Sequence, residues 1–234
     1  MASRKWKKKI NSDPRSFRRS RWSKPPAKAI LIVTEGEVTE PVYFDELKRR
    51  LNLSTVEIEV LGAGKGDPRR LAESALEERK QRRKDAKQGR LALSKAPDFD
   101  ELWIVFDTDA PLEQGRYHDG VGFADAKGVR CAESTPCFEF WLLLHLEFTT
   151  APMARFADVK PKLERMLGCP YAKNSEESAE RIPPLLDHLK KASERAEQVR
   201  AHHQQAGTPR PANPSTEVDK LIDSIKEAAS PANR

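Results

Sequence analysis

Acidic residues follow two short apolar runs of the sequence, at the point where each run ends. Glu35 comes two residues after the run Ile30 to Val33, and Asp107 and Asp109 follow the run Leu102 to Phe106. Apolar runs of this length are typical of strands that are buried on both faces of a parallel sheet. Because open α/β sheets bind their ligands at the carboxyl ends of such strands, we expect these three carboxylates to share one site.

Three carboxylates at one edge of a sheet repel one another, and a divalent cation is the usual remedy. Hard cations such as Mg²⁺ and Mn²⁺ prefer oxygen ligands. The sequence therefore predicts a Mg²⁺ or Mn²⁺ site held by Glu35, Asp107 and Asp109. An ion of this kind polarises a phosphoryl group, activates water and stabilises a leaving oxygen, which is the chemistry of phosphodiester hydrolysis.

One further acid lies inside an apolar stretch. Glu139 belongs to a run that predicts a largely buried helix from Pro136 to His145. A buried glutamate must be neutralised, paired or bound to a metal, so Glu139 is a further candidate for the site, with structural pairing as the alternative. His145 lies six residues further on, on another face of the helix, and we expect a core or capping role for it.

A tight turn is expected between the first strand and the helix that follows. Gly36 permits a turn that a side chain would obstruct. Thr39 and Pro41 suit the N-cap and the first turn of a helix. Glu37 lies in this turn, and we expect it to complete or modulate the ligand shell together with Glu139.

Residues 1–27 form a strongly basic arm with a single acid, Asp13. Trp6, Phe17 and Trp22 are interleaved with its cations, a combination that suits phosphate contact and base stacking. The alternative is a solubilising tail. The cations expected to bind nucleic acid are Arg4, Lys5, Lys7, Lys8, Lys9, Arg18, Arg19 and Arg21 in the arm, and Lys65 in a later loop.

The glycine-rich loop Leu61 to Asp67 places Lys65 where it could approach a scissile phosphate. An ordinary flexible loop is the alternative interpretation. The loop lacks the spacing and the Lys-Ser/Thr ending of a P-loop, so nucleotide binding is not expected there.

Composition bounds the class of protein. Of 234 residues, 38% are hydrophobic and 33% are charged, so the chain can bury a core beneath a charged exterior. The formal net charge of +6 favours a polyanionic partner only mildly, because the excess is concentrated in the arm. The three cysteines form neither a metal-type pair nor an even disulfide set, which favours a reducing, cytoplasmic location. No apolar run is long enough to span a bilayer, so no membrane partner is expected.

The order of expected elements indicates the α/β class, with a central, mostly parallel, Rossmann-like sheet flanked by helices and a helical C-terminal part. We expect three regions: the arm (1–27), an α/β core (28–150) and a helical part packed on that core (151–234). Within the core, the pattern predicts a helix at 39–51, an edge strand at 56–60, a long helix opened by Asp67 and Pro68, and a last strand at 128–133.

Other segments are less regular in pattern. The charged run 78–90 is expected to extend into solvent or a loop, and 111–125 to be irregular. Helices are expected at 159–167, 176–206 and 216–229, the last of them capped by Ser215 or Thr216.

Four blocks of this sequence, in order, resemble the RloB-like family. They are Thr34 to Phe44, Val105 to Asp109, Ser134 to His145 and Asn213 to Thr216. The resemblance spans residues 28–225, and its pairing of strand-Glu-Gly with strand-Asp-x-Asp is similar to the Toprim domain of topoisomerases, primases and several nucleases. It implies a Toprim-like fold and a role in defence against phage.

The resemblance also implies roles for individual residues. Glu35 would hold a metal or act as general acid/base, as the equivalent Toprim glutamate does, while Asp107 and Asp109 would hold the metal. Some Toprim nucleases act with an ATPase partner. Because this sequence has no ATP-binding motif, such an ATPase would be a separate chain.

These expectations combine into a metal-dependent nuclease of the RloB/Toprim type that acts on DNA or RNA in anti-phage defence. Its catalytic residues would be Glu35, Glu37 and Glu139. The alternative is a non-catalytic, Toprim-like module that binds nucleic acid or a partner protein, since a fold alone does not decide the chemistry. The sequence leaves open whether the substrate is DNA or RNA and whether the chain forms a homo-oligomer.

Overall fold

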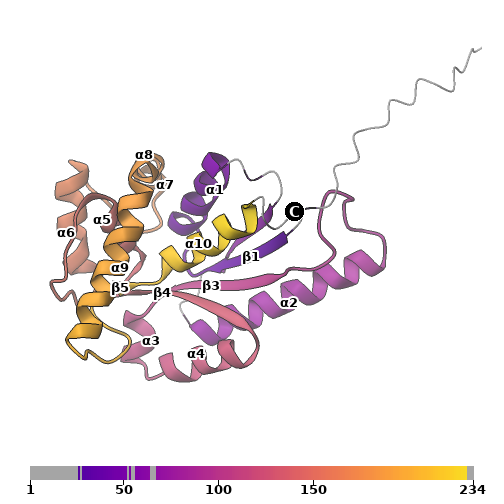
Figure 1. The fold of residues 1–234 in the computed structure, drawn as a ribbon, viewed down its shortest axis with the longest axis horizontal. Coiled ribbons are helices and arrows are strands. Elements are labelled where there is room, and N and C mark those ends of the chain that lie inside the picture. Colours follow the sequence, from indigo (N-terminus) through magenta and orange to yellow (C-terminus); the bar gives the residue numbers. More distant parts are fainter. Residues whose placement is uncertain (1–25, 27, 52, 54–55, 64–66, 231–234) are drawn as a thin grey trace, which may run out of the picture.

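The computed structural model describes residues 26, 28–51, 53, 56–63 and 67–230 (Figure 1). The nucleic-acid-binding residues expected in the basic arm and in the glycine-rich loop lie outside this part of the chain. They are Arg4, Lys5, Lys7, Lys8, Lys9, Arg18, Arg19, Arg21 and Lys65.

A five-stranded sheet organises the described chain, in the order β2-β1-β3-β4-β5. Its first four strands pair in parallel, and β5 pairs antiparallel with β4. This confirms the predicted α/β class with a mostly parallel sheet. The strands are β1 (Lys28–Thr34), β2 (Val56–Gly62), β3 (Glu101–Asp107), β4 (Val129–Thr135) and β5 (Ser215–Thr216).

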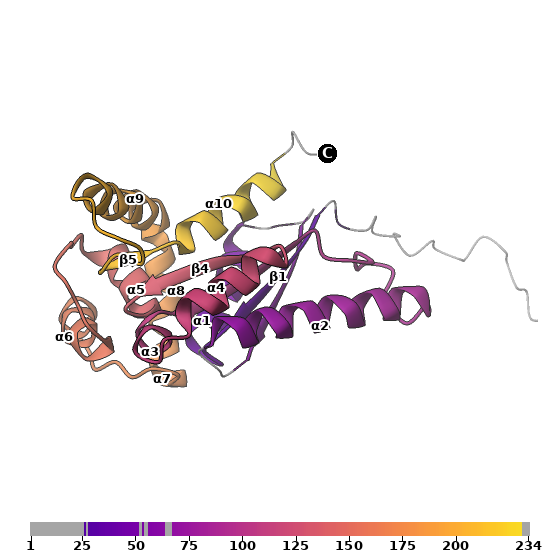
Figure 2. The ribbon, with the colours of Figure 1, turned by 90° about the horizontal axis from the view of Figure 1, so that it is seen from below.

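The continuous apolar runs arise because both faces of the sheet are covered. Along β1, Ile30 and Ile32 face one core cluster, and Leu31 and Val33 face another. The first cluster is completed by α1 (Thr39–Leu51) and α10 (Val218–Ala229), and the second by α2 (Pro68–Lys87) and α4 (Tyr117–Ala126). Figures 1 and 2 show these two pairs of helices on opposite sides of the sheet.

The helical C-terminal part is also present as predicted. Most of it gathers at the carboxyl end of the strands, around the buried helix α5 (Phe138–Leu146), whereas its last helix, α10, lies on one face of the sheet (Figure 1). The elements around α5 are α6 (Phe156–Leu167), α7 (Glu176–Ala179), α8 (Ile182–Leu185), the 3₁₀ helix η1 (Leu186–His188) and α9 (Leu189–Gln205).

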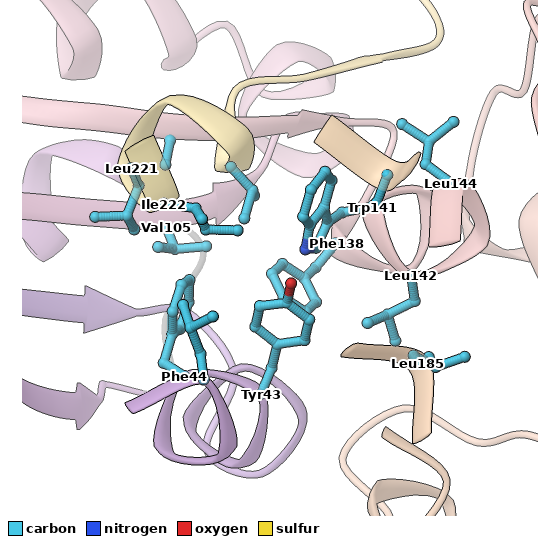
Figure 3. Packing of buried hydrophobic residues seen from close by; sticks show 14 of the residues in the cluster. Tyr43, Phe44, Val105, Phe138, Trp141, Leu142, Leu144, Leu185, Leu221 and Ile222 are labelled. Atoms are coloured by element: carbon cyan, nitrogen blue, oxygen red, sulfur yellow. The ribbon is translucent and has the colours of Figure 1, made fainter. Parts of the chain in front are cut away.

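An aromatic cluster joins α1 to α5. Tyr43 contacts Phe138 and Trp141 edge-on, with ring centroids 5.5 and 6.2 Å apart (Figure 3). Such pairs contribute about 0.5–1.5 kcal/mol each beyond the burial of their area. The cluster fixes the first turn of α1 relative to α5, and these two elements carry Glu40 and Glu139.

The long helix begins as predicted and continues further than expected. The Asp67 side chain accepts a hydrogen bond from the Arg69 amide, and Pro68 occupies the first helical position. The charged run that we expected to extend into solvent or a loop stays helical to Lys87. One reason is Arg82, which is 3% exposed and forms salt bridges to Glu57 and Glu59 on β2.

The prediction that residues 111–125 are irregular is wrong. This segment forms α3 (Asp109–Glu113) and most of α4. Glycines weakened the helical signal, yet Gly120 has a packing role, because a Cβ there would lie 2.5 Å from Pro68 Cγ. The glycine therefore permits α4 to approach the start of α2 closely.

The strand expected to be last in the sheet is not the last one. β4 is followed by β5, whose two residues, Ser215 and Thr216, were expected to cap a helix. Thr216 has both roles, because its hydroxyl accepts a hydrogen bond of 3.3 Å from the amide of Val218, the first residue of α10, and lies 2.9 Å from the hydroxyl of Ser134. A two-residue strand has no periodicity, so the sequence pattern did not distinguish it from a cap.

Candidate metal centre and active site

A small cavity opens where β1 and β3 end. It has a volume of about 220 Å³ and is lined mostly by charged side chains. They come from the β1–α1 turn, the first turn of α1, the end of β3, the start of α5 and the loop between α6 and α7. The lining residues are Glu35, Gly36, Glu37, Glu40, Asp107, Glu139, Lys173 and Asn174.

Glu35 and Asp107 are joined directly through the backbone of β3. The Glu35 amide donates to the Val105 carbonyl at 2.9 Å, and the Asp107 amide donates to Glu35 Oε2 at 2.9 Å. Asp107 Oδ1 in turn accepts a hydrogen bond of 2.7 Å from the Phe138 amide, at the N-terminus of α5. The partial positive charge of that helix end favours a carboxylate there.

The turn after β1 positions a further carboxylate, Glu40. The Gly36 amide donates to Glu40 Oε1 at 3.1 Å, and the Thr34 hydroxyl donates to the Gly36 carbonyl at 2.8 Å. A Cβ on Gly36 would lie 2.0 Å from Glu40 Oε2. Glycine is therefore required for Glu40 to keep this position, where the side chain is only 5% exposed.

Lys173 brings a positive charge into the cavity from the loop between α6 and α7. Its Nζ lies 2.5 Å from Asp107 Oδ2 and 3.4 Å from Glu139 Oε2. The next residue, Asn174, has a φ of 53°, in the left-handed region that asparagine tolerates better than most residues. This backbone conformation belongs to the turn that carries Lys173 over the ends of the strands.

The deepest part of the cluster contains Glu139 and Cys137. Ligand atoms of Asp107, Cys137 and Glu139 lie within 4.8 Å of one another, all three residues are buried, and the group could hold a metal ion. The Tyr171 hydroxyl donates to Glu139 Oε1 at 3.4 Å. Glu139 Oε2 is buried and accepts no hydrogen bond from the described residues. A buried carboxylate oxygen without a donor is costly unless a cation lies near it, and the Lys173 ammonium, 3.4 Å away, supplies that charge.

Burial and mutual repulsion raise the carboxyl pKa values. Desolvation, followed by the charge of Asp107, raises the pKa of Glu35 to about 7 and that of Glu40 to about 8. Desolvation also raises the pKa of Glu139 to about 7, with the charge of Asp107 acting in the same direction and that of Lys173 opposing it. Burial raises the pKa of Asp107 as well, although Lys173 opposes this shift. The folded cluster therefore holds its protons more tightly than free carboxyl groups do.

Lys173 remains the cationic partner of this cluster. Burial alone would lower its pKa, but the charges of Asp107 and Glu139 raise the pKa above the usual range of lysine. The ammonium is thus held charged beside the two acids.

Two expected site residues lie at the margin. Glu37 is exposed at the mouth of the cavity. Asp109 is half-buried at the start of α3, where its Oδ1 accepts from the Ala110 amide at 2.7 Å. It does not line the cavity, but its charge contributes to the raised pKa values of Glu35 and Asp107.

His145 lies in the core, as expected. Its Nε2 is 3.2 Å from the Tyr43 hydroxyl and its Nδ1 is 3.0 Å from the Trp141 carbonyl. Burial lowers the pKa of this imidazole to about 4, so the ring stays neutral.

Sequence reasoning did not identify Glu40, Cys137 and Lys173. Glu40 had a local signal, because it lies in the first turn of the helix after the glycine turn and faces back along it. Cys137 directly precedes the helix that contains Glu139 and was considered only as a partner for other cysteines. Lys173 is 66 residues from Asp107 in sequence, and no local pattern indicates that its loop returns to this edge of the sheet.

Comparison with known families agrees with the four sequence blocks. The family profile described as RloB-like protein matches residues 30–225. No curated protein and no solved structure matches the chain. Among the described helices, none is both long and apolar enough to cross a bilayer.

Proposed function

This chain belongs to the RloB-like protein family, and we propose that it is a Mg²⁺- or Mn²⁺-dependent nuclease that cleaves DNA or RNA in anti-phage defence. The observation that carries the proposal is the cavity in which Glu35, Glu40, Asp107 and Glu139 converge. Clusters of carboxylates with raised pKa values, placed at the carboxyl ends of parallel strands, are typical of functional sites.

The residues fit a divalent cation. Their ligand atoms are almost all carboxylate oxygens. Burial, and to a lesser extent the charge of Asp107, raises the pKa values of Glu35 and Glu139, and a bound cation would oppose this shift. Glu35, Asp107 and Asp109 would hold the ion, and Glu37 and Glu139 would complete or modulate the shell. When bound, the ion would polarise the phosphoryl group and lower the pKa of water.

Glu35 is suited to proton transfer. A general acid/base works best when its pKa is near the operating pH, and burial brings the pKa of Glu35 to about 7. The hydrogen bond from the Asp107 amide holds one carboxylate oxygen, which leaves Oε1 for a water molecule or a leaving group.

Lys173 is suited to contact phosphate. Its side chain is 33% exposed, so the ammonium reaches both the buried acids and the cavity mouth. A lysine in this position would orient a phosphate group as a point charge. The basic arm would supply affinity without choice of sequence, and an ATPase, if one takes part, would be a separate chain.

The salt bridges formed by Lys173 support a second candidate function, a non-catalytic binding module. Lys173 pairs with both Asp107 and Glu139, and such pairing neutralises part of the cluster. In a module of this kind, the cavity and the arm would hold nucleic acid or a partner protein without cleavage.

Cleavage of labelled oligonucleotides distinguishes the two candidates. We expect full-length protein to fragment DNA or RNA with Mn²⁺ or Mg²⁺ and not with excess chelator. The double variant Asp107→Asn and Asp109→Asn should be inactive, which excludes a contaminating nuclease. Binding without cleavage under all metal conditions would instead support the module, and equal cleavage by the double variant would reject the assigned site.

A further inference from the structure

The cavity wall differs chemically from what lies behind it. The anionic ligands that line the cavity are all carboxylates, whereas behind this wall the Cys137 thiol lies beside Asp107 and Glu139. Cys137 is fully buried, Glu139 is 2% exposed and Asp107 is 5% exposed. We call these three residues the inner triad.

Two observations point to a cation position at the inner triad. One is geometric, since ligand atoms of its three buried residues lie within 4.8 Å of one another. The other is that the Lys173 ammonium lies between Asp107 and Glu139, 2.5 and 3.4 Å from their oxygens, and pairs there with Glu139 Oε2, which accepts no hydrogen bond within the described part of the chain. A positive charge is thus already accommodated at this point by the protein's own side chains.

We propose that the inner triad is a binding site for a thiophilic divalent cation such as Zn²⁺, and that the Lys173 ammonium competes with this cation for Asp107 and Glu139. The inference deepens the proposed function, because the triad shares Asp107 with the expected Mg²⁺ or Mn²⁺ site. It adds to that site a second metal position, which has a softer ligand, the thiolate of Cys137.

The choice of metal follows from the donor set. A thiolate with two carboxylates suits Zn²⁺ and Co²⁺, whereas Mg²⁺ is restricted to oxygen ligands. Cys137 would bind as the thiolate, so each bound ion would displace one thiol proton to solvent. The Tyr171 hydroxyl, which donates to Glu139 Oε1, would orient that carboxylate from the other side.

Competition with Lys173 follows from electrostatics. An ammonium and a divalent ion cannot both lie between the same two buried carboxylates, because the two cations would repel each other strongly where little water screens them. Lys173 is carried by a loop and its side chain is one third exposed, so it can turn toward the cavity mouth when an ion binds. Metal affinity of the inner triad is therefore reduced by the free energy needed to move Lys173.

Co²⁺ absorption tests the proposal without reference to catalysis. The chain has three cysteines, so the double variant Cys131→Ser and Cys169→Ser keeps only Cys137. On titration with Co²⁺, this full-length variant should develop the near-ultraviolet thiolate-to-Co²⁺ charge-transfer band, and excess Zn²⁺ should abolish the band. Adding Cys137→Ser should remove the band while Mn²⁺ binding, followed by calorimetry, persists.

A second titration tests the role of Lys173. Lys173→Met should tighten Co²⁺ binding by roughly tenfold or more, because it removes the competing cation. Lys190→Met, on α9 with a side chain that is 93% exposed, is the matched control and should leave the affinity unchanged.

Absence of the charge-transfer band from the variant that keeps only Cys137 would show that the inner triad does not bind the metal ion through its thiol. If Mn²⁺ still bound to that variant, the proposed nuclease site would stand alone. Loss of Mn²⁺ binding as well would instead count against the proposed function. Unchanged or weaker Co²⁺ affinity in Lys173→Met would show that Lys173 does not compete with the metal ion.

Discussion

The acidic residues of the cavity are held in an unfavourable electrostatic arrangement by the fold around them. Glu40 is the clearest case, because it is 5% exposed and forms no salt bridge within the described chain, and the first cause of its raised pKa is desolvation. Hydrogen bonds from the backbone, among them the one from the Gly36 amide, compensate only part of that cost. Clusters that carry such a cost are common at functional sites, where binding of a ligand relieves it.

The first prediction concerns stability against pH without metal. The pKa of Glu40 is raised to about 8 from an ordinary value of 4.5, so the folded state holds its proton more tightly than the unfolded state. Stability from this group is complete below about pH 4.5 and is lost as the pH rises through about 8, with a maximum slope of about 1.4 kcal/mol per pH unit for one proton. Urea unfolding in chelator should show this loss.

Glu40→Gln should reduce that dependence, because the amide has no proton to lose and can still accept from the Gly36 amide. Glu35 and Glu139, whose pKa values are raised to about 7, keep their own share of it. Glu77→Gln, on the exposed surface of α2, serves as the control and should follow the wild-type curve. Identical slopes for Glu40→Gln and wild type would show that Glu40 is not a protonated, buried acid near neutral pH.

The second prediction concerns Glu35 in catalysis. Glu35→Gln should lower the cleavage rate by roughly a hundredfold or more, the usual loss when a general acid/base is removed. Affinity for nucleic acid should change little, because the contacts expected to supply it come from the arm. Single-turnover kinetics and a binding titration on one oligonucleotide measure both quantities, and full activity of Glu35→Gln would exclude the residue from the mechanism.

At the scale of elements, the β1–α1 turn decides whether the carboxylates converge. Two glycines leave no space around this turn for a side chain. A Cβ on Gly36 would clash with the flexible Glu40 carboxylate, and a Cβ on Gly62 would clash with the backbone of the turn. The distances from the Gly62 Cβ would be 2.9 Å to Glu37 Cα and 3.0 Å to the Gly36 carbonyl oxygen. The end of β2 therefore acts as a rigid support beneath the turn.

The third prediction compares the two glycines. Gly36→Ala should leave the melting temperature nearly unchanged, because only the end of the Glu40 side chain must move, but it should weaken Mn²⁺ binding. Gly62→Ala must displace backbone, so it should destabilise the fold by about 1–3 kcal/mol, the usual cost of overpacking. Thermal melts and calorimetry distinguish them, and an equal loss of stability in both variants would contradict this account of the turn.

Elements with strong periodicity or caps could be predicted from the sequence, and those defined by tertiary contacts could not. The buried strands, α1 and the start of α2 follow from β-branched runs, helical spacing and the Asp67 cap. β5 and α4 depend on partners distant in sequence, since β5 pairs with β4 and Gly120 of α4 fits against Pro68. The same distinction applies to the site, where Glu35, Asp107 and Glu139 had local signals and Lys173 had none.

At the scale of the whole molecule, the arm and the carboxylates join opposite ends of β1. The arm precedes Lys28, which opens the strand, and Glu35 follows its last residue. Seven strand residues at about 3.3 Å each separate the two ends by roughly 23 Å. Nucleic acid that contacts both the arm and the cavity would therefore have to extend along the molecule or meet an arm that returns along it.

The fourth prediction concerns the arm. Deleting residues 1–24 should weaken binding to any nucleic acid and reduce the slope of log K against log salt, because fewer counterions are released. Turnover at saturating substrate should survive, since the carboxylates lie outside the deletion. Salt titrations of full-length and truncated protein on one oligonucleotide make the comparison, and equal slopes would mean that the arm does not contact phosphates.

The central claim, that the acids at the ends of β1 and β3 form a divalent-metal site, is tested most directly by calorimetric titration with Mn²⁺. Wild-type protein should bind Mn²⁺, and the double variant Asp107→Asn and Asp109→Asn should not, while circular dichroism shows that it remains folded. Asp119→Asn with Asp125→Asn, two exposed acids of α4, removes the same charge elsewhere and should bind as wild type does. Unchanged Mn²⁺ affinity in the Asp107/Asp109 double variant would contradict the account.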